Sequence, residues 1–420
     1  MMVRNILLVL TCLTAISCSK KLKMLQYSSA DSIYEAASTK AERKIKCDCG
    51  DPNNYAPDNR FPQFEDVKYV RVNFHYPNSS DLDKNYTGEE ALEYSNGLLD
   101  NGNRKLATNK KMNLPEDNDT PVYDTRIQYV LHKDSSTSTG YAVYEDVDDE
   151  NWFFIKKGRG KNNYSRTIIK KFARGEDSIL NIFAMAYPPD SVGKKGFKSG
   201  RAGIALGTSL KIAGIRKHGV TGHWRFAALM NHEIGHIFGL RHSWYKNDGC
   251  EDTPPNANCW NSSKEEGPCF GVTSNNMMDY NNQQIAITPC QIGVMKKYMH
   301  RETGKARRLL IKDWCDYNPE KSLVITEDIE LNRAIDMKGD IIITSGNSLR
   351  LSCRVHMPKG GKIIVEPGAK LILNGCKLHN DCGATWGGIE VQSKGDLKGE
   401  IEYLGRVKIE GLKEEGEEES

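Results

Sequence analysis

The sequence predicts an α+β domain built on a mixed sheet, followed by a β-rich domain that folds as a parallel β-helix or a related solenoid. Apolar and polar residues alternate over residues 67–75, as in a half-buried strand. Residues 224–238 are predicted to form a helix. From about Asn318 onward, short β-rich runs separated by glycine replace helical periodicity. The first domain is therefore placed at residues 67–316 and the second at residues 317–413.

The other elements of the first domain are predicted in chain order. Apolar residues with imperfect helical spacing predict a helix over residues 89–108. Runs rich in isoleucine, valine and aromatic residues predict strands over residues 126–131 and 181–186, the second of them largely buried. Together with the strand at 67–75 and the helix at 224–238, these elements give a mixed sheet covered by helices.

The helix at 224–238 carries a pattern of metal-binding residues. His232 and His236 are four residues apart, so both imidazoles lie on one face of the helix and can bind one metal ion. Glu233 stands beside them and can reach a metal-bound water. Gly239 can adopt the left-handed conformation that ends a helix, which returns His242 to the metal as a third ligand. The pattern predicts a zinc site with one position open to water.

This extended pattern is specific, because five identities at fixed offsets arise by chance with a probability on the order of 10⁻⁷ per start position. It resembles the motif of the metzincin zinc peptidases, which is followed downstream by a methionine-containing turn. Residues 274–280 resemble the Met-turn of the pappalysin family within that clan. The resemblance implies that Met278 forms a hydrophobic floor beneath the metal and that Tyr280 stabilises the developing oxyanion. The alternative is a polar loop with two buried methionines.

The resemblance to pappalysins extends over roughly residues 69–301, because residues 249–255 and 287–291 also resemble segments of that family. In the first segment, the family has a longer spacer between its cysteine and Asp-Thr-Pro, which helps to bind calcium. Here only Glu251 intervenes, so a calcium ion is doubtful. Some members carry an acidic residue after the Met-turn tyrosine that selects basic side chains. This chain has only Asn and Gln over residues 281–284, so that preference is not carried over.

The resemblance implies a zinc-dependent endopeptidase that acts on protein or peptide substrates. Zinc held by His232, His236 and His242 would activate a water molecule, and Glu233 would take its proton. The glycine-rich residues 199–206 are predicted to form an edge strand on which an extended peptide pairs. The alternative for that strand is close packing of backbones, which also favours glycine.

The N-terminus has the layout of a secretory signal over residues 1–17, with Arg4, an apolar run at residues 6–10 and small residues before Cys18. The run is too short to span a bilayer. The small residues resemble a bacterial lipobox, in which Ala15 stands where leucine is usual. Lipidation of Cys18 with a membrane tether, and ordinary cleavage nearby, both remain open. The chain is expected to be a periplasmic, cell-surface or secreted protein.

Charge and cysteine content narrow the classes of partner. The formal net charge is only +3, so nothing suggests a nucleic-acid partner. Of the 12 cysteines, those outside the signal and its border are expected to form disulfides in an exported protein. Two bridges among four of them would pin the loops around the Met-turn, although the sequence allows three pairings of Cys250, Cys259, Cys269 and Cys290.

Residues 18–66 are polar and are predicted to be a linker or a short pro-segment. Within them, Cys49 and Gly50 resemble the cysteine switch of latent metzincins, in which a pro-segment thiolate occupies the open position on zinc. The alternatives for Cys49 are a disulfide or an idle thiol.

The second domain contains an internal repeat. Residues 346–351 align with residues 368–373 at an offset of 22, which suits one rung of a parallel β-helix. Residues 386–391 are predicted to add another rung, and Cys353 and Cys376 would lie on neighbouring rungs, close enough to pair.

The role of the second domain stays open between a spacer and a binding module for a surface glycan or protein. A rival to the peptidase hypothesis is therefore an adhesion or glycan-binding protein in which zinc is structural. Glu233 argues against it, because a structural zinc site needs no adjacent base. The acidic residues 414–420 are predicted to be a solvated tail.

Overall fold

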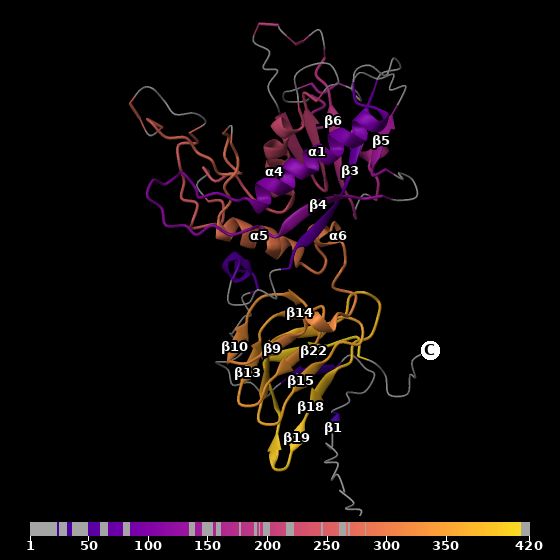
Figure 1. Cartoon of the computed structure of the whole chain (residues 1–420), viewed down its shortest axis with the longest axis vertical. Coiled ribbons are helices and arrows are strands. Elements are labelled where there is room, and N and C mark those ends of the chain that lie inside the picture. Colours follow the sequence, from indigo (N-terminus) through magenta and orange to yellow (C-terminus); the bar gives the residue numbers. More distant parts are fainter. Residues whose placement is uncertain are drawn as a thin grey trace, which may run out of the picture.

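The computed structural model describes residues 23–24, 32–35, 49–58, 66–78, 85–133, 139–144, 154–156, 161–175, 178–188, 191–192, 194–195, 202–215, 222–244, 247–259, 266–267, 269–281 and 283–412. Within these residues, an α+β domain lies above a β-solenoid in the view of Figure 1. Helices α5 (Pro289–Met299) and α6 (Lys305–Arg308) lie between them.

Three predictions fall outside the described residues, namely the signal at 1–17, the lipidation of Cys18 and the acidic tail at 414–420. Among the helices that are described, none is long and apolar enough to cross a membrane.

The α+β domain is built on a mixed sheet with the order β4-β3-β6-β8-β7, and β5 also pairs with β3. All of these pairs are parallel except β7 with β8. The strands are β3 (Lys68–Pro77), β4 (Ile127–Leu131), β5 (Tyr141–Tyr144), β6 (Leu180–Met185), β7 (Ala202–Leu206) and β8 (Ser209–Ala213). The predicted mixed sheet is confirmed, and residues 202–206 of the glycine-rich segment form its edge strand, β7.

Helices cover both faces of this sheet. On central strand β6, Ile182 and Ala184 point into the larger core, whereas Phe183 and Met185 point into a smaller cluster on the opposite face. Because both faces are covered, all six residues of β6 are buried. The helices are α1 (Gly88–Ala107), α3 (Thr167–Phe172), α4 (Trp224–Ile237), α5 (Pro289–Met299) and α6 (Lys305–Arg308).

Helices α1 and α4 pack on each other over the larger core (Figure 1). Gly102 of α1 permits this packing, because a Cβ atom there would lie 2.4 Å from Cε of Met230 on α4. The two helices predicted over residues 89–108 and 224–238 are therefore both present, within one residue at each end.

The second domain is a parallel β-solenoid, as predicted. Its strands stack into three parallel sheets, with Ile341 opposite Ile363 and Leu349 opposite Leu371, so the predicted offset of 22 is the length of one rung. Alternate residues of each strand fill one interior core. The first sheet contains β9 (Leu323–Ile325), β12 (Ile341–Ile343), β15 (Ile363–Val365) and β18 (Ile389–Val391).

The second solenoid sheet contains β10 (Ile329–Leu331), β13 (Ser348–Leu351), β16 (Lys370–Asn374) and β21 (Glu400–Leu404). The third contains β11 (Ile335–Asp336), β14 (Arg354–His356), β17 (Lys377–His379) and β22 (Arg406–Ile409). A short hairpin, β19 (Ser393–Lys394) and β20 (Leu397–Lys398), projects from the last rung, and the 3₁₀ helix η4 (Pro319–Lys321) precedes the first.

Parts of the predicted linker are built into the fold. Strand β1 (Lys23–Met24) pairs antiparallel with β18, and β2 (Ser32–Glu35) pairs antiparallel with β22, so both extend solenoid sheets. The 3₁₀ helix η2 (Pro52–Tyr55) packs against α5, where a Cβ atom on Gly293 would lie 2.2 Å from the carbonyl oxygen of Pro52. These stretches do not behave as a free linker.

Two disulfides join segments on the α+β side to the solenoid and correct two predictions. Cys49 is bonded to Cys353, so its sulfur is not available to a metal, and the cysteine-switch interpretation is wrong for this structure. The predicted pairing of Cys353 with Cys376 is also wrong. Cys376 points into the solenoid core, whereas Cys353 lies in an outer cluster with Tyr55, so the two thiols face different sides. The second disulfide joins Cys315 to Cys382.

A buried ionic cluster lies between these disulfides. The carboxylate of Asp336 accepts two hydrogen bonds from Arg307, at 2.8 and 3.0 Å, and one from Arg354 at 3.0 Å. Lys68 and His300 approach the same carboxylate at 3.9 and 3.5 Å. Burial by itself would raise the pKa of Asp336, but the surrounding cations hold it well below its usual range. Cations from the α+β domain and from the solenoid therefore share one anion.

Removal of this anion should destabilise both domains. Asp336→Asn leaves Arg354 buried without its paired carboxylate and Arg307 with Asp381 alone, which should lower the free energy of unfolding by about 3–5 kcal/mol. Urea denaturation followed by circular dichroism measures the change. Glu330→Gln, on an exposed position of the same rung, is the control and should unfold like the wild type. Equal unfolding curves for all three proteins would contradict the importance of the cluster.

Histidines at this interface should make stability depend on pH. Burial, followed by the charges of Arg354 and Lys377, lowers the pKa of His379 to about 4. The folded state therefore keeps His379 neutral while the unfolded chain binds a proton below about pH 6.5. Stability is full above that pH and should fall as the pH decreases toward 4.

Thermal unfolding across this pH range tests the expectation. His379→Gln keeps an acceptor for Arg354 but cannot titrate, so its Tm should fall less steeply than that of the wild type between pH 6.5 and 4. The metal site is the same in both proteins, so its own acid sensitivity cancels. Parallel curves would show that His379 is not responsible.

Candidate metal centre

The three predicted histidines converge at the end of α4. His232 and His236 lie one turn apart on the helix, with ring centroids 4.8 Å apart. The chain then turns back, and Nε2 of His242 comes within 3.1 Å of Nε2 of His236. One ligand nitrogen from each of the three residues lies within 4.8 Å of the other two. The structure thus brings together the three side chains that the sequence pattern singled out.

The turn after α4 depends on Gly239. Its φ is +92°, in the left-handed region that disfavours residues with a side chain. A Cβ atom at this position would also lie 2.4–2.7 Å from the ring of Tyr298 on α5. Conformation and lack of space both require glycine here, as the sequence predicted from the conformation alone.

Backbone carbonyls orient two of the imidazoles. Nδ1 of His232 lies 2.8 Å from the carbonyl oxygen of Met277, and Nδ1 of His236 lies 2.9 Å from that of Leu240. When Nδ1–H donates to a carbonyl, the lone pair is on Nε2, which is the atom that faces the other histidines. Burial is the largest cause of a lowered pKa in His232 (to about 3), His236 and His242 (to about 4), so all three are neutral near pH 7.

The Met-turn lies directly beneath these histidines. Met278 is fully buried, and a Cβ atom on Gly235 of α4 would lie only 2.8 Å from its sulfur. Asp279 accepts hydrogen bonds from the hydroxyls of Ser243 and Ser274. Because Ser243 directly follows His242, Asp279 ties the Met-turn to the third histidine. Sequence reasoning missed Gly235, Ser243 and Asp279, since only the packing of the turn on the helix reveals their contacts.

Glu233 and Tyr280 lie on the same site. Glu233 is 6% exposed, and burial raises its pKa to about 7, against a hydrogen bond from the backbone of Ala205. Tyr280 is 45% exposed, with its ring 5.9 Å from that of His232 and 4.8 Å from that of His242. The site thus combines a buried carboxyl group with an accessible phenol.

Trp244 supports this arrangement and was not singled out by the sequence. Its ring stacks on His242 at 4.1 Å, with an angle of 14° between the planes, and contacts the ring of Tyr280 at 4.5 Å. The third histidine and Tyr280 are therefore held against one aromatic surface. His223, which lies outside the ligand spacing, is at the start of α4 and contacts Asn101 of α1 instead.

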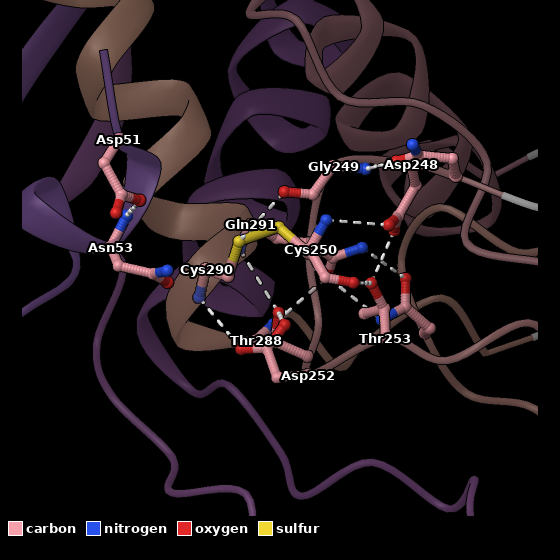
Figure 2. Close-up of a disulfide and its surroundings, with 12 residues drawn as sticks. Asp51, Asn53, Asp248, Gly249, Cys250, Asp252, Thr253, Thr288, Cys290 and Gln291 are labelled. Atoms are coloured by element: carbon pink, nitrogen blue, oxygen red, sulfur yellow. Dashed lines mark hydrogen bonds between the residues drawn. A yellow bond between two sulfur atoms is a disulfide. The ribbon is translucent and has the colours of Figure 1, made fainter. Parts of the chain in front are cut away.

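Two disulfides hold the loops between α4 and α5. Of the three pairings left open by the sequence, the structure has Cys250–Cys290 and Cys259–Cys269. Figure 2 shows the first of these beside the start of α5, where Asp252 accepts hydrogen bonds from Thr288 Oγ1 at 2.7 Å and from the Cys290 amide at 3.0 Å. The disulfide and the Asp252 carboxylate therefore fix the loop to the same helical turn.

The acidic side chains of Asp248 and Asp252 accept hydrogen bonds from their own loop and from α5. The carboxylate of Asp248 accepts from the Cys250 amide at 2.9 Å and from Thr253 Oγ1 at 2.5 Å, and both oxygens of Asp252 are used as described above (Figure 2). These carboxylates already have protein donors, which agrees with the short spacer between Cys250 and Asp252.

The contact of α4 with the Met-turn leads to a prediction at Gly235. Gly235→Ala should improve helix propensity by up to about 1 kcal/mol, but its methyl group would displace Met278 and the carbonyl that orients His232. We expect weaker zinc retention during dialysis against a chelator and a lower Tm. A Tm equal to or above that of the wild type, with zinc fully retained, would show that the turn has room for the methyl group.

Comparisons with known proteins agree with this site. Residues 220–300, which contain the histidines and the Met-turn, match the model of peptidase family M43, described as pregnancy-associated plasma protein-A. No curated protein sequence matches the chain.

Two solved structures are similar to part of this chain. Mirolysin in complex with a compound has 19% sequence identity and a TM-score of 0.40, over 59% of this chain and 96% of that chain. Mature mirolysin from Tannerella forsythia, in complex with a cleaved peptide, has 17% identity and a TM-score of 0.34, over 58% and 96%. The family match over residues 220–300 and the site that it covers support a metallopeptidase of the pappalysin family.

Proposed function

We propose that the protein is an exported, zinc-dependent endopeptidase in which Glu233 activates the attacking water. The observation that carries this proposal is the convergence of three histidine nitrogens within 4.8 Å of one another, beside a buried carboxyl group. Three imidazoles with one position left open are the ligand set of catalytic zinc sites. The Nδ1 contacts of His232 and His236 with carbonyls leave Nε2 for a metal, so the residues fit zinc.

Each side chain of the site has a distinct role in peptide hydrolysis. When bound, zinc supplies Lewis acidity that polarises the scissile carbonyl and acidifies a water molecule. Glu233 accepts the proton of the attacking water and then donates it to the leaving amine. Tyr280 donates a hydrogen bond to the oxyanion, a role that its exposed position beside His242 permits. No covalent intermediate with the chain is required.

The substrate is a protein or an extended peptide. Strand β7 lies at the edge of the sheet and contacts α4, so a peptide paired with it would pass directly over the histidines. The residues that follow Tyr280 offer amides rather than carboxylates, so the preference for a basic side chain seen in some pappalysins is not proposed.

Export is supported by the disulfides. Four bridges among the described residues fit an oxidising compartment. The signal at residues 1–17 and a membrane tether through lipidated Cys18 remain part of the proposal, as does a surface glycan or protein as partner of the solenoid.

Two variants and a control test the reaction. Glu233→Gln should keep one zinc ion per chain and lose at least about 10²–10⁴-fold in turnover, whereas His236→Ala should lose the metal. His223→Ala changes a histidine of the same region outside the site, and it should retain both zinc and activity. The readouts are zinc content and cleavage of a mixed peptide library, measured with and without a zinc chelator by mass spectrometry.

The outcomes separate the two candidate functions. Cleavage that the chelator abolishes and that Glu233→Gln lacks would establish the peptidase and show its side-chain preference. Full activity of Glu233→Gln would refute the role of the base. A zinc-loaded protein that cuts nothing would favour the rival function, a surface adhesion or glycan-binding protein in which zinc is structural.

A further inference from the structure

Strand β7 runs past the side chain of Glu233. In the pairing with β8, Gly203 lies opposite Ile212, Ala205 opposite Leu210 and Leu206 opposite Ser209. Leu206 and Ser209 flank the two-residue loop of this hairpin. In such a hairpin the pair next to the loop exchanges backbone hydrogen bonds, the next pair does not, and this pattern alternates along the strands. The backbone groups of Gly203 and Ala205 therefore point away from β8, toward the open edge of the sheet where a peptide would pair.

Gly203 has no room for a side chain, because Glu233 lies against it. A Cβ atom on residue 203 would lie 2.5 Å from Cγ of Glu233, 2.7 Å from Oε1 and 2.9 Å from Cδ. Cβ atoms in proteins are essentially never found closer than 3.0 Å to a heavy atom of a residue that is not a chain neighbour. The backbone of Gly203 is not in the left-handed region, so its conformation does not demand glycine. Glycine is required here because the side chain of Glu233 occupies the space of a Cβ atom.

The same strand also donates to the carboxyl group. The backbone N–H of Ala205, two residues along and on the same edge as the groups of Gly203, makes a hydrogen bond with Glu233. The contact with Gly203 and the hydrogen bond from Ala205 fix the side chain of Glu233 from Cγ to its carboxyl group. Glu233 is thus positioned by β7 as well as by its own helix.

We propose that Gly203 is a positioning residue for peptide hydrolysis: the lack of a side chain there lets Glu233 lie flat against the strand that pairs with the substrate. The inference rests on the proposed role of Glu233 as the base. One strand then sets the position of both the substrate backbone and the carboxylate, so their relative distance does not depend on the motion of a loop. A displacement of a reacting group by about 1 Å can reduce the rate about 10²-fold.

Gly203→Ala tests this proposal. The variant should bind zinc and unfold like the wild type, because alanine suits a strand at least as well as glycine. Its kcat should fall by about 10-fold to 10²-fold, with a change in KM of less than about threefold, since the methyl group meets Glu233 and not the open edge. Ala107→Ser is the control, because it also adds one atom, but at an exposed position at the end of α1 and outside the site. It should retain the wild-type kcat.

A double-mutant cycle distinguishes displacement of Glu233 from damage to the strand. Glu233→Asp removes one methylene group and should itself be slow. Glu233→Asp should reduce kcat by a smaller factor in the Gly203→Ala variant than in the wild type, because the shorter side chain no longer meets the added Cβ atom. Additive losses, or a Gly203→Ala enzyme with wild-type kcat, would overturn the proposal.

The two proposals can fail separately. If Glu233→Gln retains full activity, the proposed function fails and the inference fails with it. If Glu233→Gln is inactive but Gly203→Ala is fully active, only the positioning role of Gly203 is overturned.

Discussion

The buried carboxylate of Asp336 is the interaction on which the arrangement of the two domains depends. Lys68 reaches it from the first strand of the α+β sheet, Arg307 from α6 and Arg354 from the solenoid. Trp314 covers Arg307, with its ring centre 4.2 Å from the guanidinium carbon. To separate the domains would leave several buried charges without partners, which costs more than the ion pairs contribute by forming. Together with the two disulfides on either side, the cluster makes the solenoid part of the same structural unit as the peptidase domain.

Within the peptidase domain, three glycines determine how closely elements approach the metal site. Gly235 lets the Met-turn pack under α4, Gly239 lets the chain turn against α5, and Gly203 lets Glu233 lie against β7. At each position a Cβ atom would lie under 3.0 Å from a neighbouring side chain. The three histidines and Glu233 are therefore placed by close backbone contacts that side chains would prevent, which suits a site whose geometry must be held within a fraction of an ångström.

Features that depend on a short stretch of chain could be predicted from the sequence. The spacing of His232 and His236, the glycine that allows the turn to His242, and the 22-residue rung all follow from helix or solenoid geometry over a short stretch of chain. Predictions that required two distant segments to meet were weaker. The sequence leaves Cys49 open between a cysteine switch, a disulfide and an idle thiol, and it does not indicate the partner that the structure shows, Cys353, 304 residues away. Only the packing of Tyr55 against the solenoid brings these two cysteines together.

The sequence by itself determined the candidate metal-ligand set of three histidines, the neighbouring carboxyl group and the order of the two domains. These depend on residue identity and on periodicity, both of which are local. The tertiary structure alone decided the disulfide partners, the inclusion of the N-terminal segment in the solenoid, the shared anion at Asp336 and the contact of β7 with Glu233. Each of these is a contact between segments distant in the chain, and its distance is set by the packing of the whole fold rather than by any nearby residue.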